Sequence, residues 1–280
     1  MLVLDIGGSF IKYGLSDEQG NLLAGSAGQI PSDANGEYGH FLEVLRRVIA
    51  INREKESFRK ASVCIPGPFD YFTGTSKMQH KFTALYGKTI STPFEEAGIE
   101  VHYLHDSTAF LLGEAEPEDG SSPCGIMLGT GLGFAMMRKG KICVNPTQTP
   151  ALTLWNMPWK NGIAEDYVSQ RALLSRYGEA DSVKTIADAA RNGDEKALRT
   201  FREVGQSLSE ILSFLLPRLG CDGLVLGGQI AKSADLFDLQ IPVPWRVCQH
   251  PEETALRGAG RYAALGHDQC VQEMESIHLA

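Results

Sequence analysis

The stretch Asp5-Ile6-Gly7-Gly8-Ser9-Phe10-Ile11-Lys12 joins two apolar segments through a glycine-rich turn. Residues 2–6 and 10–16 predict a pair of antiparallel strands, and residues 22–24 predict a third strand after a further turn. Backbone N–H groups in the glycine turn can approach phosphate, Asp5 can hold hydrated Mg²⁺, and Lys12 adds positive charge. A hairpin whose aspartate only stabilises the turn explains this stretch equally well.

A second glycine-rich stretch, Leu128-Gly129-Thr130-Gly131-Leu132-Gly133, follows the strand predicted at 125–128. A dinucleotide-binding motif requires a helix directly after its glycines, whereas the apolar residues 134–138 predict a returning strand. The pattern therefore favours a hairpin loop that offers N–H groups and the Thr130 hydroxyl to phosphate.

The third glycine-rich stretch is Leu226-Gly227-Gly228, after a strand predicted at 223–226. These glycines allow a flat approach to adenine or ribose. Taken alone, however, they are better explained as a plain β-turn.

Asp106 lies between a predicted strand at 101–104 and a helix predicted to begin at residue 107. A carboxylate in a cleft at this position can accept the proton of a substrate hydroxyl that attacks a γ-phosphate. Aspartate is also a preferred helix cap, and without the other motifs capping is the favoured explanation.

Composition limits the class of protein. The chain has 280 residues, is 43% hydrophobic and carries a net charge of −8, which suits two lobes and opposes a broad nucleic-acid surface. No apolar run approaches the roughly 20 residues of a membrane helix, and the sequence shows no signal peptide, so we expect a cytoplasmic protein. The six cysteines lack paired spacing, and we expect buried reduced thiols.

Taken in order, these segments resemble the ROK family of sugar kinases, within the actin/hexokinase/Hsp70 superfamily. The resemblance extends from Asp5 to about Leu265. The segments that carry it, besides the three glycine-rich stretches, are Ile65-Pro66-Gly67-Pro68-Phe69-Asp70, His105-Asp106-Ser107-Thr108-Ala109, Gly162 with Glu165-Asp166-Tyr167-Val168-Ser169, and Leu256-Arg257-Gly258-Ala259.

The resemblance implies an α/β, two-lobed actin-like ATPase (ribonuclease H-like) fold, with a duplicated mixed β-sheet, flanking helices and an interlobe cleft. We expect an N-terminal lobe at 1–115, with the C-terminal helix at about 255–280 packing back on it. A nucleotide-binding lobe is expected at 116–254. The boundary is placed in the polar stretch 116–123.

The implied activity is that of an ATP-dependent carbohydrate kinase, a phosphotransferase that acts on a hydroxyl of a hexose or sugar-like substrate. Asp106 is expected to be the catalytic base, and Asp5 to hold Mg²⁺ through water. Glu165, His105 and His80 are expected to contact the substrate. Gly227 and Gly228 are expected to border the adenosine of ATP, and the phosphates are assigned to Gly7, Gly8, Ser9, Lys12, Gly129, Thr130 and Gly131. The family also implies a homodimer, and the composition leads us to expect neither nucleic acid nor membrane as a partner.

The sequence departs from the family at its sugar-reading parts. The cysteine positions of the family's zinc motif are occupied by Asn156, Pro158 and Ile163, so zinc is not expected. Residues 141–155 contain neither the Glu nor the His of the family's ExGH segment, and His105 replaces an asparagine. Substrate choice is expected to be rewritten in the segment 145–160, with Trp155 and Trp159, although core packing is the commoner fate of tryptophan.

Two other functions stay open at this point. A nucleotide- or sugar-binding protein with weak or lost catalysis fits the missing ExGH segment, and the retained Asp106 opposes it. A non-kinase ATPase of the same superfamily shares the phosphate loops but has no need of Asp106 in a sugar cleft.

Overall fold

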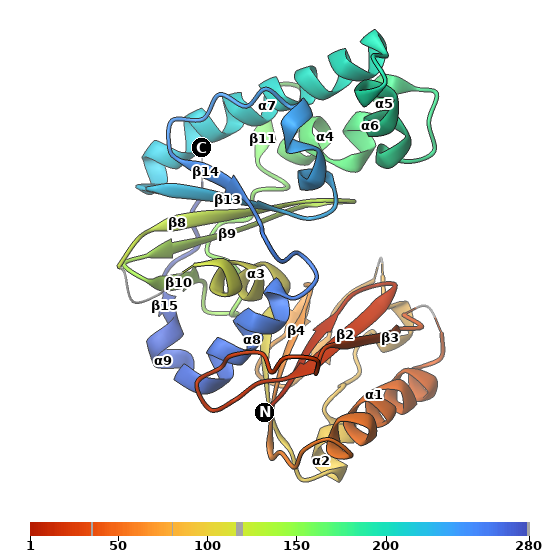
Figure 1. The fold of residues 1–280 in the computed structure, drawn as a ribbon. Helices are drawn as coiled ribbons and strands as arrows, with labels where there is room; N and C mark the ends of the chain where they lie inside the picture. The colour runs from red at the N-terminus through yellow and green to blue at the C-terminus, as the bar shows by residue number, and fades with distance from the viewer. Residues whose placement is uncertain (35, 80, 116–119, 279–280) are drawn as a thin grey trace.

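A computed structural model describes residues 1–34, 36–79, 81–115 and 120–278. Two large sheets lie one above the other, with helices between them and on their outer sides (Figure 1). The first sheet has the order β3-β2-β1-β4-β7, in which β1, β4 and β7 are parallel and β2 and β3 antiparallel. Its strands are β1 (Leu2–Ile6), β2 (Phe10–Leu15), β3 (Gly28–Pro31), β4 (Lys60–Ile65) and β7 (Glu100–His105).

The strand predicted at 22–24 is wrong. Leu22 makes only an isolated bridge to Ser16, and the third strand of the meander is β3, which pairs with β2. The reason lies in Ser26, whose buried hydroxyl accepts from Leu15 N at 3.0 Å and lies 2.7 Å from the Leu23 carbonyl oxygen. This side chain takes the place of ladder bonds, so the chain turns before it pairs again.

The second sheet has the order β14-β13-β8-β9-β10-β15. Its strands are β8 (Pro123–Leu128), β9 (Leu132–Arg138), β10 (Lys141–Val144), β13 (Gly223–Gly227), β14 (Trp245–Val247) and β15 (Val271–Glu273). Because β8 and β13 are parallel and Gly223 is paired with Pro123, Cys124 and Cys221 come together and form a disulfide. The expectation of reduced thiols is wrong for this pair, whose 97-residue separation gave no local signal.

Helices α1 (Tyr38–Arg53) and α2 (Thr92–Glu96) flank the first sheet, and α4 (Ala164–Val168), α5 (Gln170–Tyr177), α6 (Val183–Arg191) and α7 (Glu195–Leu219) flank the second (Figure 1). The sequence predicts one helix over 165–177, but Ser169 is extended and divides it into α4 and α5. The sequence also predicts a helix over 195–216 that Pro217 closes. The helix instead continues to Leu219, whose burial holds the last turn, and Gly220 ends it at a φ of 67°.

Helices α3 (Asp106–Glu114) and α8 (Thr254–Leu265) lie between the two sheets and pack closely on each other (Figure 1). Glycines allow this approach: a Cβ on Gly258 would lie 1.8 Å from the Ala109 carbonyl oxygen, and one on Gly113 would lie 1.9 Å from that of Thr254. Helix α8 also packs on β4 and β1. The tail beyond it differs from expectation, because β15 joins the second sheet beside β10.

The remaining elements are short: β5 (Phe69–Asp70), β6 (Thr75–Ser76), β11 (Pro158–Trp159), β12 (Gly162–Ile163), η1 (Thr83–Leu85), η3 (Ile230–Leu236) and α9 (His267–Cys270). Within the part of the chain that the structure describes, no helix combines the length and apolar character needed to cross a bilayer.

Candidate active site

The candidate site begins where the three parallel strands of the first sheet end. Asp5 is paired with Cys64 at the end of β1, and Ile65 with His105 at the end of β7, so Asp5, the 65–68 turn and Asp106 share one edge. Ligands in open α/β sheets bind outside the carboxyl ends of parallel strands. The topology therefore brings the two predicted carboxylates together from 101 positions apart in the chain.

Asp5 is held among charged neighbours. Lys12 is its partner across the β1–β2 hairpin, and the Cys64 Sγ lies 3.7 Å from its Oδ1. Burial raises the pKa of Asp5 to about 6; Lys12 opposes this shift, and Asp106 and Glu252 add to it. An ionised Asp5 is therefore costly until a cation approaches.

Asp106 is the first residue of α3 and lies beside two donors. Its Oδ1 is 2.9 Å from His105 Nδ1, 2.7 Å from Ser107 N and 3.3 Å from Ser107 Oγ. Burial alone would raise the pKa of Asp106, but the His105 imidazole, the Lys81 ammonium and the Ser107 N–H outweigh it and lower this pKa to about 2. Asp106 is thus a carboxylate at neutral pH.

The geometry selects one tautomer of His105. Its Nδ1 lies near both the carboxylate and Ser107 N, at 2.9 and 3.1 Å, and cannot donate to one while accepting from the other. A proton on Nδ1 satisfies all partners, since Oδ1 then accepts from both His105 and Ser107. The hydrogen bonds that the described residues make to this carboxylate all fall on Oδ1. Among the described residues none falls on Oδ2, which is left to accept from another molecule.

The second sheet brings its glycine-rich loops to the same helix. A Cβ on Gly133 would lie 3.1 Å from Ser107 Oγ, and one on Gly227 would lie 2.3 Å from the Phe110 ring of α3. Gly228 has a φ of 84°, and a Cβ there would lie 2.2 Å from the Leu128 carbonyl oxygen. Packing against α3 and β8 therefore accounts for these glycines without any ligand, and an adenosine role for Gly227 and Gly228 stays a prediction.

The two predicted phosphate loops keep exposed backbone. Gly8 and Ser9 are exposed in the β1–β2 turn, where the Gly7 N donates to the Phe10 carbonyl at 2.9 Å. Thr130 and Gly131 are exposed in the β8–β9 turn. A phosphate role for these exposed loops stays a prediction.

Glu165, predicted to contact substrate, is engaged with the second loop instead. Its Oε2 accepts from Leu132 N at 2.8 Å and lies 2.9 Å from where a Gly131 Cβ would be. Gln170 also holds this loop, through its N–H to the Gly129 carbonyl. A Glu165 contact with substrate stays a prediction, and the structure gives this carboxylate the role of ordering the loop.

Two charged residues at the site were missed from the sequence. Glu252, in the loop before α8, lies 2.7 Å from Lys12 of β2 and 3.6 Å from Lys232 of η3, so it pairs with a cation from each of these elements. The positive charge of Lys81 lowers the pKa of Asp106. Glu252 is 240 positions from Lys12, and the sequence carries no local sign of that contact.

Three further predicted residues have different outcomes. His80 lies outside the described residues. Trp155 is 47% exposed, and its carbonyl accepts from Glu165 N at 3.1 Å, whereas Trp159 packs edge-on against Phe214. Of the two tryptophans, Trp155 is thus the one available to a ligand.

The carboxylates fit a hydrated magnesium ion. Mg²⁺ takes oxygen ligands and is usually held by one or two carboxylates plus substrate phosphates. Asp5 offers such an oxygen, and a cation would offset the burial that raises its pKa. Within the described residues, no group of three or more His, Cys, Asp or Glu side chains could hold a metal ion.

Comparisons with known proteins were made by family model, by sequence and by structure. No family model matches the chain. The chain is 27% identical over 221 residues to the N-acetyl-D-glucosamine kinase of Vibrio vulnificus (strain YJ016), covering 69% of this chain and 72% of that protein.

Solved structures share the whole fold. A ROK family glucokinase from Streptomyces griseus, in complex with glucose and AMPPNP, matches with a TM-score of 0.70 and 20% identity, covering 95% of this chain and 99% of that one. A ROK hexokinase from Thermus thermophilus matches with a TM-score of 0.74 and 21% identity, covering 95% and 98%.

The chain has the fold of the ROK family sugar kinases to which these comparisons show it to be similar. The resemblance to the ROK family and the fold class predicted from the sequence are confirmed. Similarity to ATP-dependent sugar kinases agrees with the predicted activity.

Proposed function

We propose that this chain is an ATP-dependent kinase that phosphorylates a hydroxyl of a hexose or a sugar-like substrate. The observation that carries the proposal is Asp106. It stands ionised at the head of α3, with Oδ1 fixed by His105 and Ser107 and with Oδ2 open. A substrate hydroxyl that donates to Oδ2 is oriented for attack and loses its proton to this carboxylate.

The low pKa of Asp106 suits phosphoryl transfer. The transition state is loose in most analyses, so the acceptor oxygen needs orientation more than strong deprotonation. A weakly basic carboxylate, rigidly held, supplies that orientation.

The phosphates of ATP are assigned to the two exposed glycine turns at 7–9 and 129–131, and Lys12, opposite Asp5 on β2, is assigned to them as a cation. Asp5 would hold Mg²⁺, which supplies charge neutralisation for the phosphate oxygens when bound. Because the pKa of Asp5 is about 6, protonation below that pH weakens its hold on a cation.

Substrate class follows from the similarity to the Vibrio enzyme. That protein's name gives N-acetyl-D-glucosamine as its substrate, so N-acyl hexosamines come first among the acceptors to be tested. The exposed Trp155 beside Glu165 offers a ring face for a sugar.

The test is ADP release from Mg-ATP across hexoses, N-acyl hexosamines and polyols, with Asp106→Asn beside the parent. The N-cap of α3 is His105, and asparagine at 106 keeps an Oδ1 that accepts from Ser107 N, so the fold is kept. Asp194→Asn is the matched control, because Asp194 caps α7 by accepting from Ala197 N at 2.7 Å. We expect Asp106→Asn to lower sugar-dependent turnover by about 10²–10⁴-fold and Asp194→Asn to leave it unchanged.

A binding protein with lost catalysis is the competing function. ATP binding without sugar-dependent ADP in the parent, over the whole panel, would favour it. Equal turnover in the parent and in Asp106→Asn would remove Asp106 from catalysis.

We further propose a cytoplasmic homodimer, with lobes at 1–115 and 116–254 and α8 packed on the first. Light scattering coupled to size exclusion tests the dimer. Limited proteolysis tests the boundary, which should be cut near 116–123.

A further inference from the structure

The carboxylate of Glu252 lies between two lysines that are far apart in the chain. Its Oε2 is 2.7 Å from Nζ of Lys12 in β2, and its Oε1 is 3.6 Å from Nζ of Lys232 in η3. The hydrogen bond and the charge of Lys12 lower the pKa of Glu252 most strongly, and Lys232 and a hydrogen bond from the Gln229 side chain add to this effect. Glu252 is therefore an anion at neutral pH, and it contacts the lysine assigned to the phosphates of ATP.

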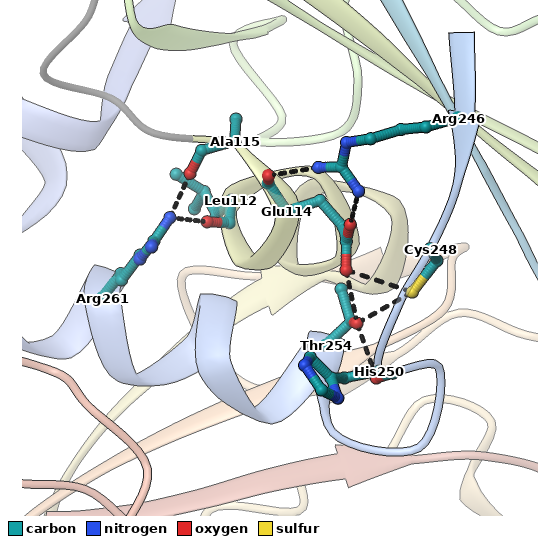
Figure 2. A network of polar contacts seen from close by, with 8 residues as sticks. All are labelled: Leu112, Glu114, Ala115, Arg246, Cys248, His250, Thr254 and Arg261. Atoms are coloured by element: carbon teal, nitrogen blue, oxygen red, sulfur yellow. Dashed lines mark hydrogen bonds and ion pairs between the residues drawn. The ribbon is translucent and has the colours of Figure 1, made fainter.

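The loop that carries Glu252 is anchored at both ends by one buried carboxylate. This carboxylate belongs to Glu114, the last residue of α3, whose side chain is only 6% exposed. Its Oε1 lies 3.1 Å from Cys248 Sγ and 2.9 Å from Thr254 Oγ1, and Thr254 Oγ1 is also 2.7 Å from the His250 carbonyl oxygen (Figure 2). The backbone on either side of Glu252 is thus held in place, and the contact with Lys12 depends on the Glu252 side chain.

The ion pair between Glu252 and Lys12 is accessible to a competing anion. The Glu252 side chain is 59% exposed and that of Lys12 is 24% exposed. Exposed ion pairs contribute little to stability, because water and salt compete for both partners. A phosphate chain carries more charge than a carboxylate and offers more acceptor oxygens. Phosphate at Lys12 would also repel the Glu252 carboxylate, since two anions that share one ammonium lie close together.

Lys12 faces a second carboxylate, that of Asp5, its partner on β1. Burial raises the pKa of Asp5 to about 6, Lys12 opposes this rise, and Glu252 adds to it. Movement of Glu252 away from Lys12 therefore favours an ionised Asp5, which is the form that binds a cation. Both consequences, a released lysine and an ionised Asp5, favour the binding of Mg-ATP.

We propose that Glu252 is an internal competitor of the nucleotide: its carboxylate holds Lys12, and the triphosphate of ATP displaces it when it binds this lysine. The inference rests on the proposed function, because it uses Lys12 as a phosphate contact. Once displaced, Glu252 keeps its contacts with Lys232 and Gln229, beside the third glycine-rich stretch. Glu252 thus limits the affinity for ATP and couples the loop 248–254 to nucleotide binding.

The test is isothermal titration calorimetry of the full chain with AMPPNP, a non-hydrolysable analogue of ATP, and Mg²⁺. Binding is then measured apart from turnover. Glu252→Gln removes the charge and keeps the size of an exposed side chain. We expect this variant to lower the Kd of Mg-AMPPNP by about two- to fivefold, the range that corresponds to an exposed ion pair.

Glu253→Gln is the matched control. It removes the same charge from the adjacent residue, whose side chain is 39% exposed and is paired with Arg257 of α8 at 2.8 Å. Its Kd should equal that of the parent. Lys12→Gln completes a double-mutant cycle. It should weaken binding, and adding Glu252→Gln to it should recover little or nothing, because the carboxylate then has no lysine to withhold.

Three results would overturn the inference and leave the proposed function standing: an unchanged Kd in Glu252→Gln, an equal gain in Glu253→Gln, or a full gain in the Lys12→Gln background. Weaker binding by Glu252→Gln would overturn it too, because the carboxylate would then orient Lys12 for the phosphates. A parent that binds no Mg-AMPPNP, with or without an N-acyl hexosamine, would refute the proposed function and this inference with it.

Discussion

The contact between α3 and α8 makes Gly258 the most sensitive glycine for the position of Asp106. A Cβ at residue 258 would lie 1.8 Å from the Ala109 carbonyl oxygen, whereas real Cβ contacts essentially never fall below 3.0 Å. Gly258→Ala therefore forces the two helices apart by about 1 Å. Since the clash is with backbone, no change of rotamer relieves it.

The expected magnitude follows from two opposed effects. Alanine gains about 1 kcal/mol over glycine inside a helix. Overpacking costs about 1–3 kcal/mol, and here the separation also loosens the packing of α8 on β4 and β1. Because the clash is with backbone, the upper end of that cost applies, and about 3 kcal/mol less the 1 kcal/mol gained leaves a net loss of about 2 kcal/mol in the free energy of unfolding.

Urea unfolding followed by circular dichroism measures this change. Gly39→Ala is the matched control, because Gly39 lies in α1, and a Cβ there would have nothing within 4 Å. It should gain about 0.5–1 kcal/mol from helix propensity alone. If Gly258→Ala gained stability as Gly39→Ala does, the close approach of α8 to α3 would be refuted.

Two further predictions concern His105 and Gly228. The pKa of Asp106 is about 2 in the fold against an ordinary 3.8, so its ionisation stabilises the protein above about pH 4, and that stabilisation is lost as the pH falls toward 2. His105→Asn removes the imidazole that lowers the pKa of Asp106. The difference in unfolding free energy between parent and variant, measured by urea unfolding, should therefore shrink by about 1 kcal/mol between pH 5 and pH 3. A difference that stays constant with pH would contradict the pairing. Gly228→Ala would place a Cβ at a positive φ and against the Leu128 carbonyl, so it should lower the free energy of unfolding by about 2 kcal/mol or more in the same assay. Gly178→Ala is the control: Gly178 has a φ of 79° but open space around it, so the loss there should be about 1 kcal/mol. Equal losses would show that the Leu128 contact is relieved at no cost.

Local pattern was enough for many elements. Apolar patterns predict a helix over 41–51 and strands over 2–6, 61–65 and 101–104. The structure has them as α1, β1, β4 and β7 with small differences at their ends, because burial leaves its pattern in the sequence. The glycine turns after β1 and β8 were also identified, since a turn needs particular residues at particular positions.

Local pattern failed where a side chain or a distant element overrode it. Ser26 moved the third strand to 28–31, and the burial of Leu219 carried α7 past Pro217. Propensity is a weak guide at such positions, because tertiary contacts are worth more than the preference of one residue.

The sequence by itself determined which residues are the candidates for the chemistry, because a carboxylate after a strand and a glycine turn are local features. Only the tertiary structure decided what each of them contacts. The pairing of β8 with β13 joined Cys124 to Cys221, and the folding of the last loop against β2 set Glu252 on Lys12. The packing of α8 on α3 placed Arg257 and Arg261 around one cavity. Such contacts depend on the register of strands and the approach of helices, which no local stretch of sequence records.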